Sequence, residues 1–286
     1  DKNGFKDVVI IGAYPYHLDV IKNDNGKLKF GWTTIFDAHI ESAKKISKPI
    51  ANSVTDFDRD GTTEILVNVY NFNDDRSWSA VLFDPVNGKV KAQIKNSFVT
   101  SANDLNNDGR YFFFGTETKD QSIPTTGTLK VFAFAKGSIK ELLHIDNARW
   151  ISPRVVNTSP SLTTHVDGIS SLAEANVLCV DFENIGQKAF FIVVPGADGG
   201  SSIVAYYLSK EGKARKAALA INSPSGVSGE ILRARKESDG KYTLLLQVKT
   251  FGTPSVALNF TGAEAKTVGR FRAANSKTFI PVAAGI

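Results

Sequence analysis

One acidic run stands out in the sequence, Asp56-Phe57-Asp58-Arg59-Asp60-Gly61-Thr62-Thr63-Glu64, and it leads directly into Ile65-Leu66-Val67-Asn68-Val69-Tyr70. Its carboxylates at alternate positions, its glycine and its final acid direct oxygen atoms toward one point. The mutual repulsion of these carboxylates is costly unless a hard cation lies among them. The run therefore predicts a calcium-binding loop.

The residues after the loop decide which kind of calcium loop it is. An EF-hand needs a bidentate Glu at its twelfth position, but that position is Val67, inside an apolar, β-branched run that predicts a strand. The last ligand is then Glu64, at the ninth position. A loop of the form D-x-D-x-D-G-x-x-E between two strands resembles the FG-GAP or VCBS repeat, the blade unit of integrin-alpha-like β-propellers. The resemblance implies that five residues hold Ca²⁺. Thr62 would contribute its backbone carbonyl, and the other four would contribute their side chains: Asp56, Asp58, Asp60 and Glu64. The alternative is an ordinary solvated turn.

Weaker versions of this loop occur elsewhere in the chain. In the next repeat the ninth position is Phe112, so one carboxylate is missing and the affinity for calcium should fall. Another incomplete loop opens the chain. The weaker predicted metal ligands of these two loops are Asp104, Asn106, Asp108 and Arg110, and Asp1, Asn3 and Asp7. The runs 181–186 and 235–240 have lost acids or carry an arginine at the first position, and we predict that they bind no metal.

A strand, a glycine turn and a second strand recur along the chain. The turn glycines lie roughly 60 residues apart on average, at Gly26, Gly88, Gly137, Gly212 and Gly262. Before each hairpin comes a more apolar strand suited to burial on both faces, at 7–12, 64–70, 111–115, 189–194 and 242–248. Before each acidic loop comes a further strand, at 50–56, 98–104, 176–181 and 230–235, with a last copy at 279–286. Four antiparallel strands form the blade of a β-propeller, so the sequence predicts an all-β propeller with five blade repeats.

We expect residues 1–286 to form a single β-propeller domain. Strand 279–286 is expected to complete the first blade and so to close a five-bladed ring. The alternative is that the chain is part of a larger, seven-bladed ring. A long inter-blade insertion is predicted at 146–175, and its candidate ligand-binding residues are Arg149, Trp150, Arg154 and His165. The alternative for this segment is a loop that packs its tryptophan against the rim of the ring.

Composition restricts the classes of function. Apolar residues make up 42% of the chain and charged residues 22%, and no apolar run is long enough to span a membrane. The net charge of +5 comes from interspersed acids and bases, a pattern that does not indicate nucleic-acid binding. Cys179 is the single cysteine and lies in an apolar run, so we expect it in the core and exclude an intrachain disulfide. No signal segment is visible, so any targeting sequence has been removed or lies outside this chain.

Motifs for zinc, for a serine nucleophile and for phosphate binding do not occur in the sequence. The best enzymatic candidates are Tyr14, Tyr16 and His17, because propeller polysaccharide lyases use Tyr and His as base and acid. The alternative is that these aromatic residues pack between blades, which we favour.

From the resemblance we expect a calcium-stabilised, non-enzymatic binding module that recognises glycan or protein through its loops. It would work in adhesion or carbohydrate binding in an extracellular, periplasmic or cell-surface location. The alternatives are a secreted polysaccharide lyase or hydrolase on the same scaffold, and a structural scaffold domain of a larger surface protein.

Overall fold

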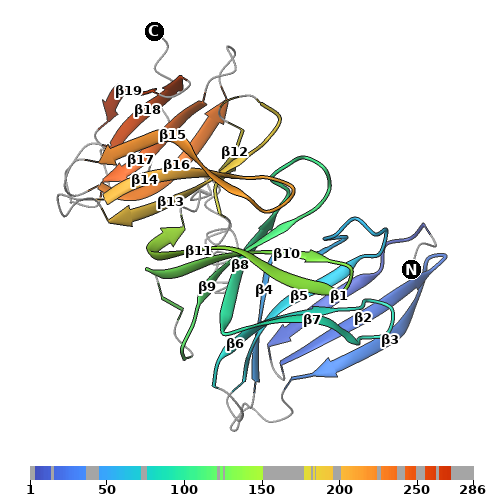
Figure 1. Cartoon of the computed structure of the whole chain (residues 1–286). Helices are drawn as coiled ribbons and strands as arrows, with labels where there is room; N and C mark the ends of the chain where they lie inside the picture. The colour runs from blue at the N-terminus through green and yellow to red at the C-terminus, as the bar shows by residue number, and fades with distance from the viewer. Residues whose placement is uncertain are drawn as a thin grey trace. The chain divides into compact units, whose positions relative to one another are not determined.

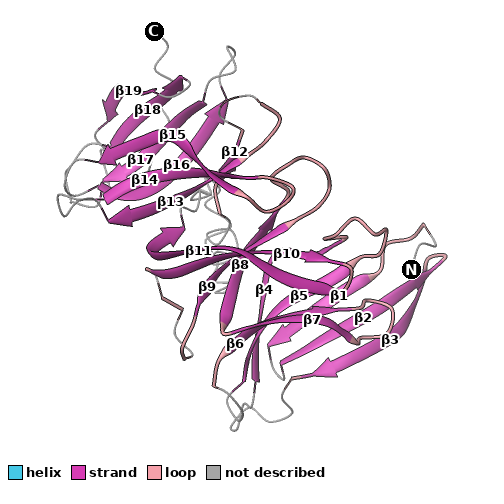
Figure 2. Ribbon diagram, in the orientation of Figure 1, coloured by secondary structure: helices cyan, strands magenta, loops and turns pink. Residues whose placement is uncertain are grey.

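The computed structural model describes the residues 4–13, 16–36, 45–71, 76–120, 123–124, 126–150, 177–181, 183, 185–195, 201–223, 227–236, 242–248, 255–261 and 264–271. Within them the chain forms β-strands joined by turns and loops, without a helix (Figure 1, Figure 2). These residues accordingly provide no helical segment with the length and apolarity needed to span a membrane. The chain divides into two compact units, residues 1–104 with 109–144 and residues 105–108 with 145–286.

The first unit begins with a sheet of three antiparallel strands, β1 (Val8–Ala13), β2 (Tyr16–Asp24) and β3 (Lys27–Ile35). Asn25 and Gly26 join β2 to β3 with φ values of 51° and 84°. A two-residue turn with both φ values positive matches the twist of the strands that it connects. The turn therefore fixes the register in which Asp24 lies opposite Lys27.

Two four-stranded sheets follow in the chain. The second sheet contains β4 (Lys45–Thr55), β5 (Glu64–Asn71), β6 (Trp78–Phe83) and β7 (Val90–Lys95). The third contains β8 (Ser97–Asn103), β9 (Phe112–Glu117), β10 (Gly127–Ala135) and β11 (Ser138–Trp150), the last of which continues into the second unit. The first strands of these two sheets, β4 and β8, lie side by side and parallel, with Ala51 opposite Ser101.

The second unit repeats this pattern. Its first sheet contains β12 (Cys179–Val180), β13 (Ala189–Pro195), β14 (Ser201–Leu208) and β15 (Ala214–Ser223). The end of β11 also pairs with β13, where Arg149 lies opposite Val193. The other sheet is an antiparallel meander of β16 (Val227–Lys236), β17 (Tyr242–Val248), β18 (Ser255–Thr261) and β19 (Glu264–Phe271).

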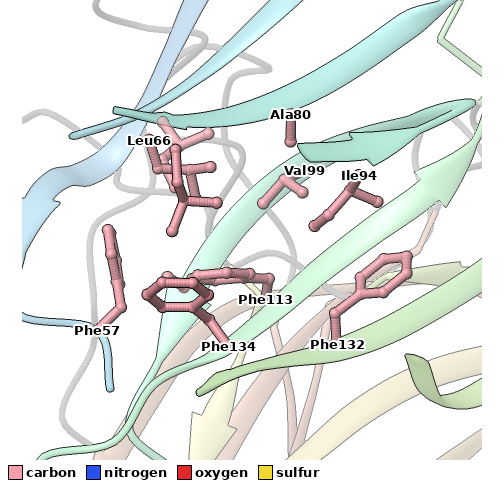
Figure 3. Close-up of a cluster of buried hydrophobic side chains, with 11 residues drawn as sticks. Phe57, Leu66, Ala80, Ile94, Val99, Phe113, Phe132 and Phe134 are labelled. Atoms are coloured by element: carbon pink, nitrogen blue, oxygen red, sulfur yellow. The ribbon is translucent and has the colours of Figure 1, made fainter. Parts of the chain in front are cut away.

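Strand β5 shows why the apolar runs form the interior of the first unit. Side chains alternate between the two faces of a strand, and both faces of β5 are buried. Leu66 packs on one side in a cluster with Phe57 and Phe113, which Figure 3 shows in close-up. Ile65 and Val67 pack on the other side, against residues of the first sheet such as Val20. The prediction that this strand is buried on both faces is confirmed.

The apolar interior also contains a buried amide. Asn68 of β5 is fully buried, donates from Nδ2 to the carbonyl of Val99 at 2.8 Å and accepts from the Val99 N–H at 2.9 Å. Both halves of the amide are therefore satisfied, as burial requires. The pair ties β5 of the second sheet to β8 of the third.

The predicted all-β class and the five predicted hairpins are confirmed: β2–β3, β6–β7, β10–β11, β14–β15 and β18–β19 are neighbours in their sheets. The first sheet shows three strands, and the strand predicted at 279–286 to complete it lies outside the described residues. The number of blades, the closure of a ring and a single domain over residues 1–286 stay predictions.

Candidate metal centre

The loop that joins β4 to β5 is held by its first aspartate. The Asp56 carboxylate accepts the N–H groups of Asp60 at 3.1 Å and Gly61 at 2.9 Å. Arg59 and Gly61 both have positive φ, 62° and 82°, a conformation for which glycine carries no steric penalty. Phe57 anchors the loop, because its ring is fully buried and packs edge-on against Tyr111 and Phe113 (rings 5.8 Å and 5.1 Å away).

Three carboxylates converge in this loop. Asp56, Asp58 and Glu64 each offer one oxygen atom, and these atoms all lie within 4.8 Å of one another. Asp58 Oδ2 accepts the N–H of Lys136 at 3.1 Å. Its Oδ1 atom is buried and has no hydrogen-bond partner among the described residues. A buried carboxylate oxygen without a donor leaves desolvation uncompensated, and a hard cation is the ligand that such oxygen atoms fit.

Glu64 is the most deeply placed member of the group. Its side chain is fully buried, Oε2 accepts the N–H of Phe57 at 3.1 Å, and Oε1 accepts from Lys91 Nζ at 2.5 Å. Burial raises the pKa of Glu64, and the bond to Lys91 opposes that rise without cancelling it. For Lys91, burial acts to lower the pKa of the ammonium, but the bond to Glu64 and the negative charges of Glu64, Asp60 and Asp58 together outweigh it, and the pKa is raised. Lys91 is therefore a firmly charged neighbour of the carboxylate group.

Not every predicted ligand belongs to the converging group. Asp60 is exposed and lies outside that group, and its Oδ1 atom accepts the N–H of Thr62 at 2.7 Å. The ligand roles of Asp60 and of the Thr62 carbonyl stay predictions. Sequence reasoning missed Lys91, which comes from β7 and reaches the loop across the sheet. The only signal for it is its position shortly after the turn glycine of the hairpin.

The second acidic loop repeats the backbone of the first with other side chains. Asp104 accepts the N–H of Gly109 at 2.9 Å, and Phe112 fills the ninth position as a buried core residue. Asn106 Oδ1 accepts from Gln187 Nε2 at 2.8 Å. Asp108 Oδ2 lies 3.8 Å from Lys210 Nζ. These side chains have partners of their own, so metal binding here, including the role assigned to Arg110, stays a prediction.

The opening loop is described only in part. Asp1 and Asn3 lie outside the described residues, while Asp7 Oδ1 accepts the N–H of Asn23 at 2.8 Å. The acidic end of the run 235–240 is also outside them. The weaker metal ligands of the opening loop stay predictions.

The fourth acidic loop, 181–189, has the same frame and a different charge balance. The Asp181 carboxylate accepts the N–H groups of Ile185 at 2.9 Å and Gly186 at 2.8 Å. Glu183 Oε2 lies 3.7 Å from Arg215 Nη2, and the guanidinium lies 4.5 Å from the centre of the Tyr207 ring. Burial and the nearby Glu183 carboxylate raise the pKa of Tyr207. Glu183 occupies the third position of this loop, as Asp58 does in the first loop, and Arg215 balances its charge.

The enzymatic candidates are only partly visible. Tyr14 lies outside the described residues, and only the backbone of Tyr16 is described. The His17 ring lies against Gly12 on the neighbouring strand, where an added Cβ would lie 2.0 Å from its Cε1 atom. Its Nε2 atom is 3.3 Å from Asp19 Oδ2. The imidazole is thus held by its own sheet, and a catalytic role for the three residues stays a prediction.

The candidate ligand-binding residues fall at the end of β11 or beyond the described residues. Trp150 packs its ring edge-on against Phe190, with centroids 6.0 Å apart. Arg149 occupies a paired position of the same strand, so residues 146–150 of the predicted insertion are strand. Arg154 and His165 lie outside the described residues.

Cys179 is partly buried, and desolvation raises the pKa of its thiol far above the usual value.

No protein-family model and no curated protein matches the sequence. Solved structures show remote similarity. A candidate 6-phosphogluconolactonase from Bacteroides fragilis is 13% identical with a TM-score of 0.42, over 94% of this chain and 67% of that one. A rhamnogalacturonan lyase from Bacillus licheniformis is 14% identical with a TM-score of 0.41, over 85% and 49%. The Aleuria aurantia lectin in complex with Fucα1-6GlcNAc is 11% identical with a TM-score of 0.35, over 91% and 76%. The chain spans about half the length of the lyase.

Proposed function

We propose that this chain is a calcium-stabilised binding module of β-propeller architecture, built from repeats of the FG-GAP or VCBS type. We place it outside the cell, in the periplasm or at the cell surface, where its loops would recognise glycan or protein. The observation that carries the proposal is the convergence of Asp56, Asp58 and Glu64 within 4.8 Å. Its companion is the buried Asp58 Oδ1 atom, which lacks a hydrogen-bond partner among the described residues.

The donor set suits calcium better than a transition metal. Every converging atom is a carboxylate oxygen, and Ca²⁺ takes about six to eight oxygen ligands at about 2.3–2.6 Å. Carboxylates fill part of such a shell, and water, Asp60 and the Thr62 carbonyl are the sources proposed for the rest. A cation here would join the end of β4 to the beginning of β5 and would bind only the folded chain. It would therefore stabilise the fold by mass action, by about 2.7 kcal/mol at a concentration of 100 times Kd.

A binding role is the better proposal because the metal loop is a structural device within a sheet. Asp56 and Gly61 hold its backbone, Phe57 anchors it in the core, and Glu64 is closed off from solvent. A catalytic cation needs an open coordination site facing a substrate, whereas the buried Glu64 side of this group faces the protein. The lyase or hydrolase and the purely structural scaffold remain as outcomes of the test.

Calorimetric titration of the chain with CaCl₂ tests the metal, and a glycan array read with calcium and with chelator tests the ligand. We expect saturable calcium binding that Asp58→Ala abolishes and that Glu183→Gln, the matched change in the fourth loop, leaves intact. We also expect glycan retention without product. Equal loss of calcium binding in both variants would overturn the loop assignment. Unsaturated uronate products absorbing in the ultraviolet would favour the lyase instead.

A further inference from the structure

A basic residue occupies one equivalent position in most of the repeats. It is the third residue after the turn glycine, at the beginning of the last strand of its sheet. In chain order the position holds Lys29, Lys91, Lys140, Arg215 and, in the last repeat, Ala265. A turn between the third and fourth strands of an antiparallel meander lies at the same end of the sheet as the loop between the first and second. This position therefore places a long basic side chain near the acidic loop of its own sheet.

Two of these residues reach that loop. Lys91 Nζ lies 2.5 Å from Glu64 Oε1, and Arg215 Nη2 lies 3.7 Å from Glu183 Oε2. Lys29 instead pairs with Asp24 at 2.7 Å, and Lys140 is exposed. The two pairs differ in burial. The side chains of Lys91 and Glu64 are 21% and 0% exposed. Those of Arg215 and Glu183 are 59% and 24% exposed. Among the described residues at this position, Lys91 alone neutralises a carboxylate that water does not reach.

We propose that Lys91 is the built-in cation of loop 56–64, and that calcium has to displace its ammonium from Glu64 in order to bind. The second half of this inference rests on the proposed calcium site, whereas the counter-ion role stands without it. A carboxylate as deeply buried as Glu64 needs a compensating charge whenever it is ionised. Lys91 provides that charge in the metal-free loop.

The same ammonium opposes a second cation. Calcium among Asp56, Asp58 and Glu64 would lie next to the positive charge that already bonds Glu64 Oε1. Two like charges a few ångströms apart repel strongly in a partly buried site. Lys91 has a flexible stem and remains partly exposed, so its head can turn toward water while its stem stays packed. Because calcium must first displace the Lys91 ammonium, its affinity for the loop is weak. Because Lys91 neutralises Glu64 when calcium is absent, the loop remains folded at low calcium.

The test compares the wild-type chain with Lys91→Met, which keeps an unbranched side chain one atom shorter and removes its charge. Lys140→Met, at the equivalent exposed position of the third repeat, is the matched control. Each chain is titrated with CaCl₂ by calorimetry and unfolded in excess chelator and in calcium. We expect Lys91→Met to lower the unfolding midpoint in chelator and to raise calcium affinity about tenfold or more. Lys140→Met should change neither.

Two further variants guard against simple misfolding. Lys91→Arg keeps the charge and should retain the weak calcium affinity of the wild type. The double variant Lys91→Met with Glu64→Gln removes both charges and should recover stability in chelator. A double variant no more stable in chelator than Lys91→Met would overturn the counter-ion role.

The outcomes separate this inference from the proposed function. Calcium binding by the wild type with unchanged affinity in Lys91→Met would overturn displacement while the proposed calcium site holds. Binding by Lys91→Met alone would support displacement and overturn calcium stabilisation of the natural chain. Failure of both chains to bind calcium would overturn displacement and the proposed metal together.

Discussion

The loops at 56–64 and 181–189 share backbone hydrogen bonds and a glycine conformation but differ in the chemistry of their side chains. In each, the first aspartate accepts the N–H groups of the fifth and sixth residues. In each, the sixth residue is a glycine with positive φ, 82° for Gly61 and 78° for Gly186. The first loop then carries Asp58 and buried Glu64 at its third and ninth positions, where the fourth loop carries Glu183 and Ala189. These hydrogen bonds and this glycine conformation form the frame of the loop, which therefore does not depend on the residues that would hold a cation.

The difference indicates which residues would carry the proposed metal chemistry. The first aspartate and the glycine are needed to form the loop in either case, so their presence alone does not indicate calcium. The ninth position decides, because a buried Glu64 completes a group of three carboxylates that a single lysine only partly compensates. With alanine at that position, one arginine balances the remaining Glu183.

The largest expected difference between the loops comes from removing the basic partner of each. In chelator, Lys91→Met should destabilise the chain by on the order of 3 kcal/mol, because it leaves Glu64 buried and uncompensated. Arg215→Met should cost less than about 1 kcal/mol, since that pair is exposed and screened by solvent. Denaturant unfolding of both variants measures the contrast. Equal costs would mean that the two pairs are alike and that burial of Glu64 does not distinguish the first loop.

A smaller and equal effect is expected from the shared frame. Asp56→Ala and Asp181→Ala each remove a charged acceptor of two backbone N–H groups, so in chelator each should cost about 1–2 kcal/mol. Denaturant unfolding again gives the numbers. In calcium, only Asp56→Ala should cost more than in chelator. A calcium-dependent cost for Asp181→Ala would show that the fourth loop also binds the ion.

An ion pair among the strands of the third sheet gives the smallest effect and a scale for ordinary pairs. Lys130 Nζ lies 3.1 Å from Glu117 and 3.5 Å from Glu141. Burial lowers the pKa of Lys130, but the two carboxylates outweigh it and raise the pKa. A raised lysine pKa adds stability that is fully present below the usual value near 10.4 and is lost as pH rises through the raised value.

Lys130→Met should therefore cost less than about 1 kcal/mol at neutral pH, with the difference from wild type shrinking above about pH 10.4. Unfolding midpoints of both chains across the alkaline range provide the check. If Lys130→Met cost as much stability as Lys91→Met, burial of the Lys91–Glu64 pair would not make that pair stronger than an ordinary one.

Much of this arrangement could be predicted from the sequence, for local reasons. Apolar runs such as 64–70 and turn pairs such as Asn25-Gly26 specify strands and hairpins through neighbouring residues alone. Asp56, Asp58 and Glu64 lie within one loop, so their spacing was enough to bring them together. Lys91 could not be found in this way, because it approaches Glu64 from another strand. Alternation along the loop also predicted Asp60 as a ligand; its carboxylate accepts the N–H of Thr62 and lies outside the converging group, so this role stays a prediction.

Thermal unfolding of the unmodified chain, in millimolar calcium and again in excess chelator, shows whether loop 56–64 holds a stabilising cation. We expect a melting temperature several degrees higher in calcium, and no such rise in Asp58→Ala. Identical melting temperatures in the two solutions would contradict this expectation. The converging carboxylates would then be a solvated turn neutralised by Lys91 alone.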